Sequence, residues 1–347
     1  MSAATFIVAG TLDQPTGGYV YDRAIIDGLR SQGLDIEVIE LPGRFPLVDD
    51  TARAALEHAL ANSRSQAPIV VDGLAAGGAP EVVERHADTR PIVVLLHHPL
   101  ADETGLDADT AARLLESERR VLACARHIVV TSRFTARRLA VLGLARSADV
   151  TVIEPGVRTA QPSRPTSGSP CRLLCVASLI PRKDHLMLVE ALGRIAELDW
   201  VCDFVGDDQR DPAQALAIRA AIDRHGLTDR IRLRGSQPRA AIDDFYAAAD
   251  LFVLGSRYEG YGMVIDEAVA HGLPIVTTTG GALADTLPVG AGIAVAPGSS
   301  DAMAEALRTL ITDTQQRACA AAGARAARAR QRDWQAAACE FASVLSV

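Results

Sequence analysis

The repeated alternation of short apolar runs with helical patterns constrains the fold of this chain most. The runs are rich in Val, Ile and Leu and are continuous, with few polar residues between the apolar ones. Continuous runs are typical of strands buried on both faces of a parallel sheet that helices cover. The sequence therefore predicts an α/β fold with parallel sheets. The predicted strands are residues 5–9, 36–41, 69–72, 92–97, 128–132, 150–154, 172–177, 201–205, 231–233, 251–255, 274–278 and 292–295.

One segment interrupts this alternation. Residues 158–170, RTAQPSRPTSGSP, are rich in Pro and Ser and show no periodicity, which predicts a linker. A length of 347 residues suits two domains. We predict two doubly wound, Rossmann-like domains over 1–160 and 171–330, followed by a helix over 331–347. Because ligands bind beyond the carboxyl ends of the strands in such sheets, we expect two facing domains with the active site in the cleft between them.

Charge and composition exclude several classes of protein. The formal net charge of −8 argues against nucleic-acid binding and against an anionic membrane surface. No apolar run reaches 18 residues, so we expect no transmembrane helix. The opening MSAATFIVAG lacks the basic start of a signal peptide, and we expect a cytoplasmic protein. We expect all six cysteines to be reduced core thiols: Cys124, Cys171, Cys175, Cys202, Cys319 and Cys339.

The basic residues are almost all arginine. Of 35 Lys and Arg side chains, only Lys183 is a lysine. A position that stays lysine in such a chain can require a compact ammonium group instead of a planar guanidinium. Chance is the alternative explanation.

The most informative stretch is RYEGYGMVIDEAVAHGLP, residues 257–274. Glu259 stands in a glycine-rich loop after a predicted buried strand, and a helix is expected to begin near Met263. Glu267 then lies about one turn into that helix. Free backbone amides of the loop and of the helix N-terminus favour an anion such as a phosphate, and the two carboxylates can accept hydrogen bonds from ligand hydroxyls. The alternative is an ordinary strand–loop–helix unit, in which Glu is favoured near the helix start by the helix dipole alone.

A second stretch, VASLIPRKDH over residues 176–185, also joins a predicted strand to a helix. Arg182 and Lys183 are adjacent there. Two cations at the carboxyl end of a strand suit a diphosphate leaving group, on which negative charge develops as its bond breaks. The alternative is an exposed pair that only contacts solvent.

Two shorter motifs carry weaker signals. Gly17 and Gly18 lie between the first strand and the first helix, where they allow close approach of a phosphate or sugar, although a plain turn fits equally well. His97 and His98 end a predicted strand, and at most one of them is expected to face a ligand; packing between helix and strand is the alternative. The chain has no dinucleotide fingerprint, P-loop, nucleophile elbow or ligand spacing typical of a metal site.

Together these residues resemble the retaining glycosyltransferases of family 4, which have the GT-B fold. The E-x7-E motif of that family matches Glu259 and Glu267, within the wider pattern S-x-x-E-G-x-G at residues 256–262. The family's P-R-K signature matches residues 181–183. Its glycine pair after the first strand matches Gly17 and Gly18, and its histidine at a strand end matches His97. The resemblance covers nearly the whole chain in order.

The resemblance implies a role for each of these residues. Arg182 and Lys183 hold the donor diphosphate, Glu267 binds the ribose, and Glu259 contacts the transferred sugar. His97 is implied to touch that sugar, and the catalytic group is then Lys183, Arg182, Glu259 and His97. Donor binding is implied for Gly17, Gly18, Ser178, Arg182, Lys183, Gly260, Tyr261, Gly262, Met263 and Glu267. Gly235, Ser236 and Gln237 are expected to line the base pocket, and the C-terminal helix with Trp334 is expected to cross back to the first domain.

Four positions depart from the family pattern. Ala177 and Ser178 stand where many members have Gly-Arg, so that arginine is absent and Arg182 is expected to supply its charge. Asp184 replaces a usual glycine, and Gly255 stands where proline is common. These departures concern donor affinity and geometry, not the class of reaction.

The resulting prediction is a retaining, metal-independent hexosyltransferase without a cofactor. Its donor is a nucleotide-diphosphate sugar, with uridine the favoured base. Its acceptor is a hydroxyl, on a small soluble molecule such as a pterin; attachment to a membrane is less favoured because basic and acidic residues are mixed over residues 102–126. The alternatives are a sugar-nucleotide epimerase of the same fold and a catalytically silent scaffold that binds a sugar nucleotide.

Overall fold

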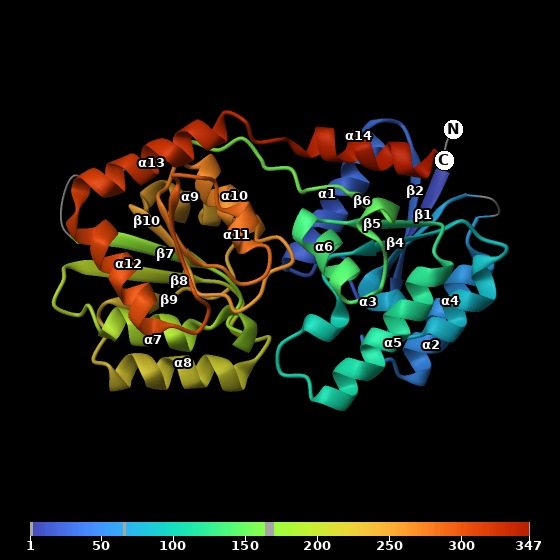
Figure 1. Cartoon of the computed structure of the whole chain (residues 1–347), viewed down its shortest axis with the longest axis horizontal. Helices are drawn as coiled ribbons and strands as arrows, with labels where there is room; N and C mark the ends of the chain where they lie inside the picture. Colours follow the sequence, from blue (N-terminus) through green and yellow to red (C-terminus); the bar gives the residue numbers. More distant parts are fainter. Residues whose placement is uncertain (1–2, 65–66, 164–169, 347) are drawn as a thin grey trace. The chain divides into compact units, whose positions relative to one another are not determined.

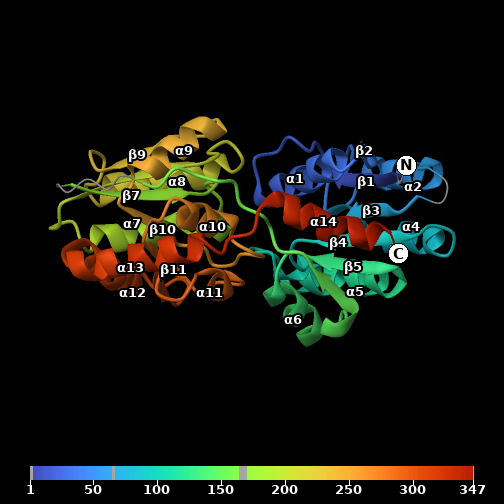
Figure 2. The ribbon, with the colours of Figure 1, turned by 90° about the horizontal axis from the view of Figure 1, so that it is seen from above.

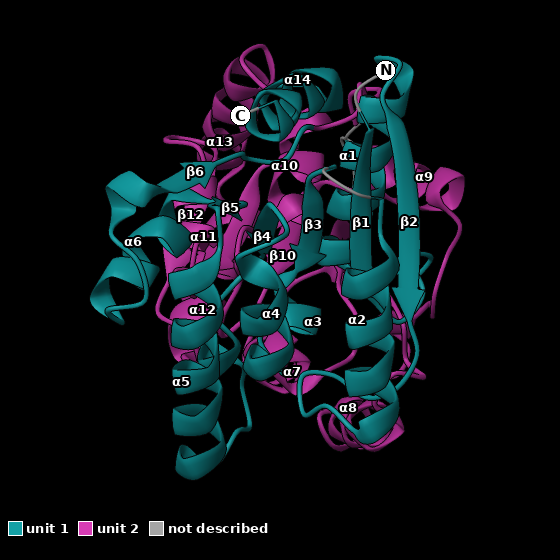
Figure 3. Cartoon of the chain, turned by 90° about the vertical axis from the view of Figure 1, so that its right-hand side faces the viewer, with its two compact units in different colours: residues 1–156, 332–347 teal, residues 157–331 magenta. Residues whose placement is uncertain are grey.

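Strands and helices alternate along the computed structural model, which describes residues 3–64, 67–163 and 170–346 (Figure 1). The chain divides into two units, shown in different colours in Figure 3. The first is Met1–Gly156 with Arg332–Val347, and the second is Val157–Gln331. Each unit contains a six-stranded sheet whose pairs are all parallel, which confirms the predicted α/β class.

The predicted linker starts just after the boundary between Gly156 and Val157, at the beginning of the second unit. Residues 158–163 belong to no helix or strand. The remainder of the predicted linker, residues 164–169, lies outside the described residues.

The first unit has the strand order β2-β1-β3-β4-β5-β6. Its strands are β1 (Ala3–Ala9), β2 (Asp35–Leu41), β3 (Ile69–Asp72), β4 (Ile92–Leu96), β5 (His127–Val130) and β6 (Val150–Val152). Its helices are α1 (Gly17–Ser31), α2 (Asp50–Asn62), α3 (Gly73–Ala76), α4 (Pro80–Ala87), α5 (Ala108–Cys124), α6 (Arg133–Val141) and α14 (Trp334–Leu345), with 3₁₀ turns at Leu100–Asp102 and Ser147–Asp149.

Helices cover both faces of this sheet. Every residue of β3 and β4 is buried, as expected for continuous apolar runs between two helical layers. Helices α2, α4 and α5 pack side by side in one layer (Figure 3). Just past the end of helix α1 stands a left-handed Gly33, where φ is 85°, a conformation typical of the residue that follows a helix C-terminus.

Helix α14 packs against α1 of the first unit (Figure 2). A Cβ on Gly28 would lie 2.4 Å from Cβ of Ala338, so only glycine allows the two helices to approach this closely. Phe341 and Phe6 place their ring centroids 5.6 Å apart. The C-terminal helix is thus part of the apolar core that covers β1.

The second unit has the strand order β12-β11-β10-β7-β8-β9. Its strands are β7 (Cys171–Val176), β8 (Trp200–Val205), β9 (Ile231–Leu233), β10 (Leu251–Leu254), β11 (Ile275–Thr278) and β12 (Gly292–Val295). Its helices are α7 (His185–Gly193), α8 (Pro212–Arg224), α9 (Arg239–Ala248), α10 (Met263–Ala270), α11 (Leu283–Thr286), α12 (Ser300–Thr312) and α13 (Thr314–Arg328), with a 3₁₀ turn at Pro181–Lys183. Helix α7 contacts α8 and α12, whereas α10 contacts α13 (Figure 1).

The strand orders identify where a ligand site is expected. In the first unit the chain order reverses between the neighbouring strands β1 and β3, and in the second between β7 and β10. Ligands of doubly wound sheets bind at such a switch point, beyond the carboxyl ends of the strands. The stretch with Arg182 and Lys183 follows β7, and the stretch with Glu259 follows β10.

The prediction of six core thiols is partly wrong. Cys171, Cys175 and Cys202 are buried in strands β7 and β8. Cys124 is half-buried at the end of α5, while Cys319 and Cys339 are exposed on α13 and α14. Those two helices are rich in alanine on all sides, so their apolar composition did not distinguish the packed face from the solvent face.

Within the described residues, no helix is both long enough and apolar enough to cross a membrane.

Candidate active site

Two loops at the switch point of the second unit bring Arg182, Lys183 and Glu259 together. Nζ of Lys183 lies 2.5 Å from Oε1 of Glu259, and Nη1 of Arg182 lies 3.2 Å from Oε2. Ser256 donates a hydrogen bond of 2.6 Å to Oε1. Both cationic side chains are 16% exposed and the carboxylate 8%, so the cluster is largely removed from solvent.

The surroundings favour the ionised form of this carboxylate. Burial raises the pKa of Glu259, but the charges of Lys183 and Arg182 and the hydrogen bonds outweigh it and lower the pKa to about 2. Burial also lowers the pKa of Lys183, which the nearby carboxylate partly offsets. Two cations share one carboxylate, so the cluster keeps a positive charge that can attract an anion.

The backbone holds these two loops in contact. The amide of Arg257 donates a hydrogen bond of 2.8 Å to the carbonyl of Arg182. On the other side, a Cβ on Gly281 would lie 2.2 Å from the carbonyl oxygen of Glu259, so glycine is required for this approach. The amide of Ala282 donates to the same carbonyl at 2.8 Å. The loop with Glu259 is therefore held between its two neighbours.

Asp184 explains one departure from the family pattern. Its φ is 47°, in the left-handed region where glycine is favoured and where Asp is tolerated better than most residues. Nε of Arg257 lies 2.8 Å from Oδ2 of Asp184, an ion pair between the two loops. The aspartate thus keeps the turn that a glycine would make and adds a charge contact.

Glu267 lies in α10, as predicted, but its partners were not predicted. Nη1 of Arg239 lies 2.5 Å from Oε1, and the hydroxyl of Tyr246 donates to Oε2 at 3.0 Å. Tyr246 is fully buried and its ring stacks on that of His271, with centroids 4.9 Å apart. Arg239 lies two residues after the expected base-pocket segment in sequence, which was the one available signal for it.

The remaining predicted residues of the second unit lie in the loops after its strands. Helix α10 begins at Met263, after a left-handed Gly262 with φ of 93°. The hydroxyl of Tyr261 donates to Asp266 at 2.6 Å, so this ring is held beside the start of the helix. Gly260 stands in the same loop, and Ser178 follows β7.

The expected base-pocket segment, Gly235, Ser236 and Gln237, lies between β9 and α9. The carbonyl of Gly235 accepts a hydrogen bond of 3.0 Å from the amide of Gly206. The side-chain amide of Gln237 donates to the carbonyl of Arg234 at 2.6 Å. The loop is therefore joined to the loop after β8, and Ser236 is exposed.

In the first unit, Gly18 and His97 are neighbours. A Cβ on Gly18 would lie 3.1 Å from Cδ2 of His97, so the imidazole ring packs on the first turn of α1, which begins at Gly17. Nε2 of His97 lies 3.0 Å from Oδ1 of Asp22. His98 contacts Glu103 instead, at 3.3 Å. The two histidines thus serve different partners, and the sequence did not reveal Asp22.

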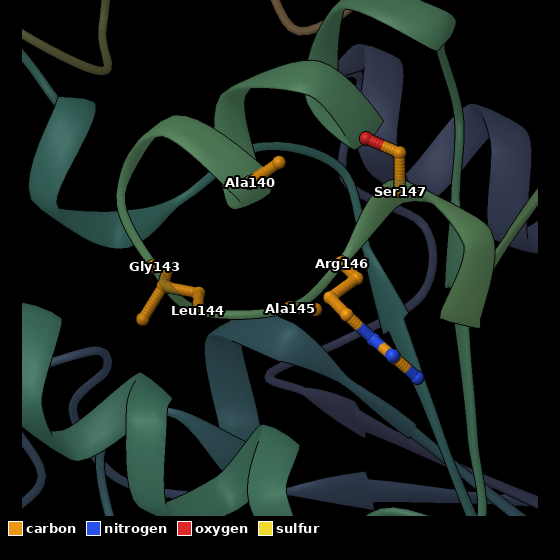
Figure 4. Close-up of a pocket in the computed structure, with 6 residues that line it drawn as sticks. All are labelled: Ala140, Gly143, Leu144, Ala145, Arg146 and Ser147. Atoms are coloured by element: carbon orange, nitrogen blue, oxygen red, sulfur yellow. The ribbon is translucent and has the colours of Figure 1, made fainter.

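Other hollows and clusters do not compete with this arrangement. A surface hollow in the first unit lies after α6 (Figure 4) and contains no predicted site residue. Its lining residues are Ala140, Gly143, Leu144, Ala145, Arg146 and Ser147. In the part of the chain that the structure describes, no three His, Cys, Asp or Glu residues are grouped so that they could hold a metal ion.

Comparison with known proteins finds similarity to glycosyltransferases. Residues 170–313 match the family model described as glycosyl transferases group 1. The D-inositol 3-phosphate glycosyltransferase of Kineococcus radiotolerans is 31% identical over 252 residues, which cover 65% of this chain and 58% of that protein. The mannosylfructose-phosphate synthase of Agrobacterium fabrum is 32% identical over 117 residues, 32% of this chain and 26% of that protein.

The chain is therefore similar to the group 1 glycosyltransferases, family 4, and the match to the family model lies in its second unit.

Solved structures of similar fold align with almost the whole chain. The sucrose-phosphate synthase of Thermosynechococcus elongatus has a TM-score of 0.84 at 18% identity, covering 99% of this chain and 98% of that one. Anabaena Alr3699/HepE, solved with UDP and glucose, has a TM-score of 0.76 at 19% identity, covering 99% of each chain. These likenesses confirm the predicted GT-B fold class at the level of its two α/β halves.

Proposed function

We propose that this chain transfers a hexosyl group from a nucleotide-diphosphate sugar to a hydroxyl, with retention of the anomeric configuration. The observation that carries the proposal is the cluster at the switch point of the second unit. There Arg182 and Lys183 share the single carboxylate of Glu259, in the two loops where the E-x7-E and P-R-K motifs stand.

The diphosphate of the donor is assigned to Arg182 and Lys183. Both cations are anchored at their loops and largely buried, so their charges act in a medium of lower dielectric than water. The N-terminus of α10, at Met263, adds a favourable potential for a phosphate. Ser178 and the loop with Gly260, Tyr261 and Gly262 supply further polar contacts in this assignment. Negative charge that develops on the leaving diphosphate is then stabilised where it forms.

The nucleoside is assigned to Glu267 and to the loop with Gly235, Ser236 and Gln237. Arg239 and Tyr246 fix the carboxylate of Glu267, so that its remaining lone pairs can accept hydrogen bonds from the two ribose hydroxyls. Uridine is the favoured base, because Anabaena Alr3699/HepE, a protein of similar fold, was solved with UDP and with UDP-glucose.

The transferred sugar is assigned to Glu259 and His97, and the backbone of Gly17 and Gly18 is assigned to donor binding. In the reaction the bond between the anomeric carbon and the diphosphate oxygen breaks, and the acceptor oxygen bonds to the same face of that carbon. The acceptor proton passes to an oxygen of the departing phosphate. No protein nucleophile is required in this sequence, and Lys183 stabilises the charge of the leaving group.

We also propose that the reaction needs no divalent metal and that the acceptor is a small soluble molecule. The two cations beside Glu259 can neutralise a diphosphate, which is the task that a metal ion performs in other transferases. The direct check on the metal is to compare turnover with and without a chelator.

Turnover with a panel of donors and acceptors tests the proposal. UDP-, GDP-, ADP- and TDP-sugars are each incubated with the chain, with and without small hydroxyl acceptors, and the released nucleotide diphosphate is measured. Release that depends on an acceptor, with a product of unchanged anomeric configuration by NMR, supports the proposal. Conversion of the donor without any acceptor indicates an epimerase, and binding without turnover indicates a scaffold.

A further inference from the structure

A buried carboxylate, that of Asp22, contacts one ring nitrogen of His97. Nε2 of its ring lies 3.0 Å from Oδ1 of Asp22, which stands on α1 and is 1% exposed. A carboxylate accepts hydrogen bonds and does not donate them, so the shared proton sits on Nε2. The ring edge beside Cδ2 and Nε2 also packs on Gly18, 3.1 and 3.3 Å from a Cβ at that position. Both contacts restrain the same edge of the imidazole.

The other ring nitrogen of His97, Nδ1, is available to contact a ligand. Among the residues that the structure describes, Nδ1 of His97 has no hydrogen-bond partner. This nitrogen is not one of the buried polar atoms that lack a partner, so it is accessible to solvent. The side chain is 20% exposed, which agrees with one open edge.

A second buried carboxylate acts on the same ring. Asp72 ends β3 and is 6% exposed, and its charge acts on His97 together with that of Asp22. Burial lowers the pKa of His97, but these two carboxylates outweigh it and the pKa is raised. Burial and the charge of Asp22 raise the pKa of Asp72 to about 7. Tyr21 also packs against the ring, with centroids 5.5 Å apart, and burial raises its pKa well above the usual value, so it stays neutral.

We propose that Asp22 is a positioning residue: it fixes the imidazole of His97 with Nε2–H facing inward, so that Nδ1 is presented to an oxygen atom of the sugar ligand. That the ligand is a sugar rests on the function proposed above. The orientation of the ring rests on contacts within the first unit alone.

One chemical consequence separates this assignment from a general-base role. When protonated, the ring donates a hydrogen bond from Nδ1 and places a positive charge beside the ligand oxygen. A group already protonated in this way cannot accept the acceptor's proton. In that state His97 donates a hydrogen bond to the ligand oxygen, and the acceptor proton has to go elsewhere, as in the phosphate-assisted step above.

The test is a pH titration of the histidine side chains by ¹⁵N NMR, on the full-length chain without ligand. The His97 signals are assigned by their loss in His97→Gln. We expect Nε2 to be protonated in both charge states of the ring. In Asp22→Asn we expect the midpoint of the His97 titration to fall by roughly one to three pH units, as for the loss of a close opposite charge. Glu103→Gln is the matched control, because Glu103 contacts the adjacent His98, and it should leave the His97 midpoint unchanged.

Two results would overturn the proposal. The first is a neutral tautomer of wild-type His97 with its proton on Nδ1, which needs no variant and so does not depend on Asp22→Asn folding. The second is a folded Asp22→Asn chain in which His97 titrates as in the wild type. Because the chain is ligand-free, a failure of the proposed function is seen separately, as the absence of turnover with every donor.

Discussion

The two units have similar sheets but differ in the charged groups at their switch points. In the second unit cations outnumber carboxylates there, and in the first unit carboxylates outnumber cations. Each has a six-stranded parallel sheet with a switch point, and each gathers ionisable side chains beyond the strand ends there. In the second unit two cations, Arg182 and Lys183, face one carboxylate. In the first, two carboxylates, Asp22 and Asp72, face one imidazole. Strand order therefore determines where a site forms, whereas the side chains determine which ligand it suits.

Two buried glutamates show how strongly local partners decide the charge state. Glu259 in the second unit has two cations beside it and a pKa of about 2. Glu118 in the first unit is 1% exposed and accepts a hydrogen bond from the amide of Leu100, and burial raises its pKa to about 8. Burial acts in the same direction on both, so the difference comes from the cations. Of these two buried glutamates, the one paired with cations is ionised at neutral pH.

The largest expected effect is on turnover, from the loss of Lys183. Lys183→Ala should lower kcat by on the order of 10²–10³-fold, the usual cost of losing one group that stabilises transition-state charge. Lys183→Arg should recover only part of the rate, since a planar guanidinium cannot take the place of a compact ammonium. Steady-state kinetics of nucleotide release measure both variants.

A separate control tests whether the Lys183→Ala chain still folds. Lys183→Ala leaves Glu259 with Arg182 as its one remaining cation, so the double variant Lys183→Ala with Glu259→Gln removes the charge that would be left underpaired. Circular dichroism and thermal melting should show both chains folded. Near-normal turnover of folded Lys183→Ala would contradict the assignment of the diphosphate to the second unit.

A smaller effect is expected on nucleotide affinity, from the residue that sequence reasoning missed. Arg239→Ala frees the carboxylate of Glu267 from its ion pair and should weaken binding of the preferred nucleoside diphosphate about tenfold, or about 1.4 kcal/mol. Asp243→Asn is the control, because Asp243 contacts the same guanidinium at 3.2 Å but is 43% exposed. Isothermal titration calorimetry measures both. Equal affinities for the wild type and Arg239→Ala would show that Arg239 does not position the ribose-binding group.

The smallest effect is on stability and depends on pH. The folded-state pKa of Glu118 lies above its ordinary value of 4.5, so the stability linked to its protonation is present below pH 4.5 and is lost as the pH rises through about 8. Glu118→Gln should therefore gain Tm relative to the wild type between pH 5.5 and pH 9. A change of 1 kcal/mol corresponds to about 2–4 °C in domains of this size.

The paired glutamate should respond in the opposite way. Glu259 has a lowered pKa, so its ionised form contributes stability that is present above pH 4.5 and is lost as the pH falls toward about 2. At pH 7, Glu259→Gln should lower the Tm relative to the wild type, whereas Glu118→Gln should not. If both variants changed Tm alike at every pH, the contrast between a paired and an unpaired buried carboxylate would be wrong.

The sequence predicted the strands and the loop motifs well, because these depend on local pattern. Residues 69–72, 231–233 and 292–295 are strands as predicted, and Met263 begins its helix as expected. The two motif loops were expected at strand ends, but the sequence could not show that β7 and β10 are neighbours. That adjacency follows from the strand order, to which residues far apart in the chain contribute.

The partners of the predicted site residues could not be predicted in the same way. Asp22 is an ordinary polar residue of a helix in the sequence, and only the fold places it beside His97, 75 positions away. Tyr246 and Arg239 reach Glu267 across 21 and 28 positions. The left-handed backbone of Asp184 was also invisible, because Asp adopts that conformation far less often than glycine.

The most direct test of the central claim, that the second unit holds the diphosphate, is the binding of nucleoside diphosphates by isothermal titration calorimetry with a chelator present. UDP, GDP, ADP and TDP are titrated into the wild type, Lys183→Ala and Arg194→Ala, the last of which removes a 44% exposed cation of the same unit. We predict that one nucleotide binds the wild type and Arg194→Ala equally, and binds Lys183→Ala at least about tenfold more weakly. Equal binding by all three folded chains, or binding of none of the four nucleotides, would contradict the account.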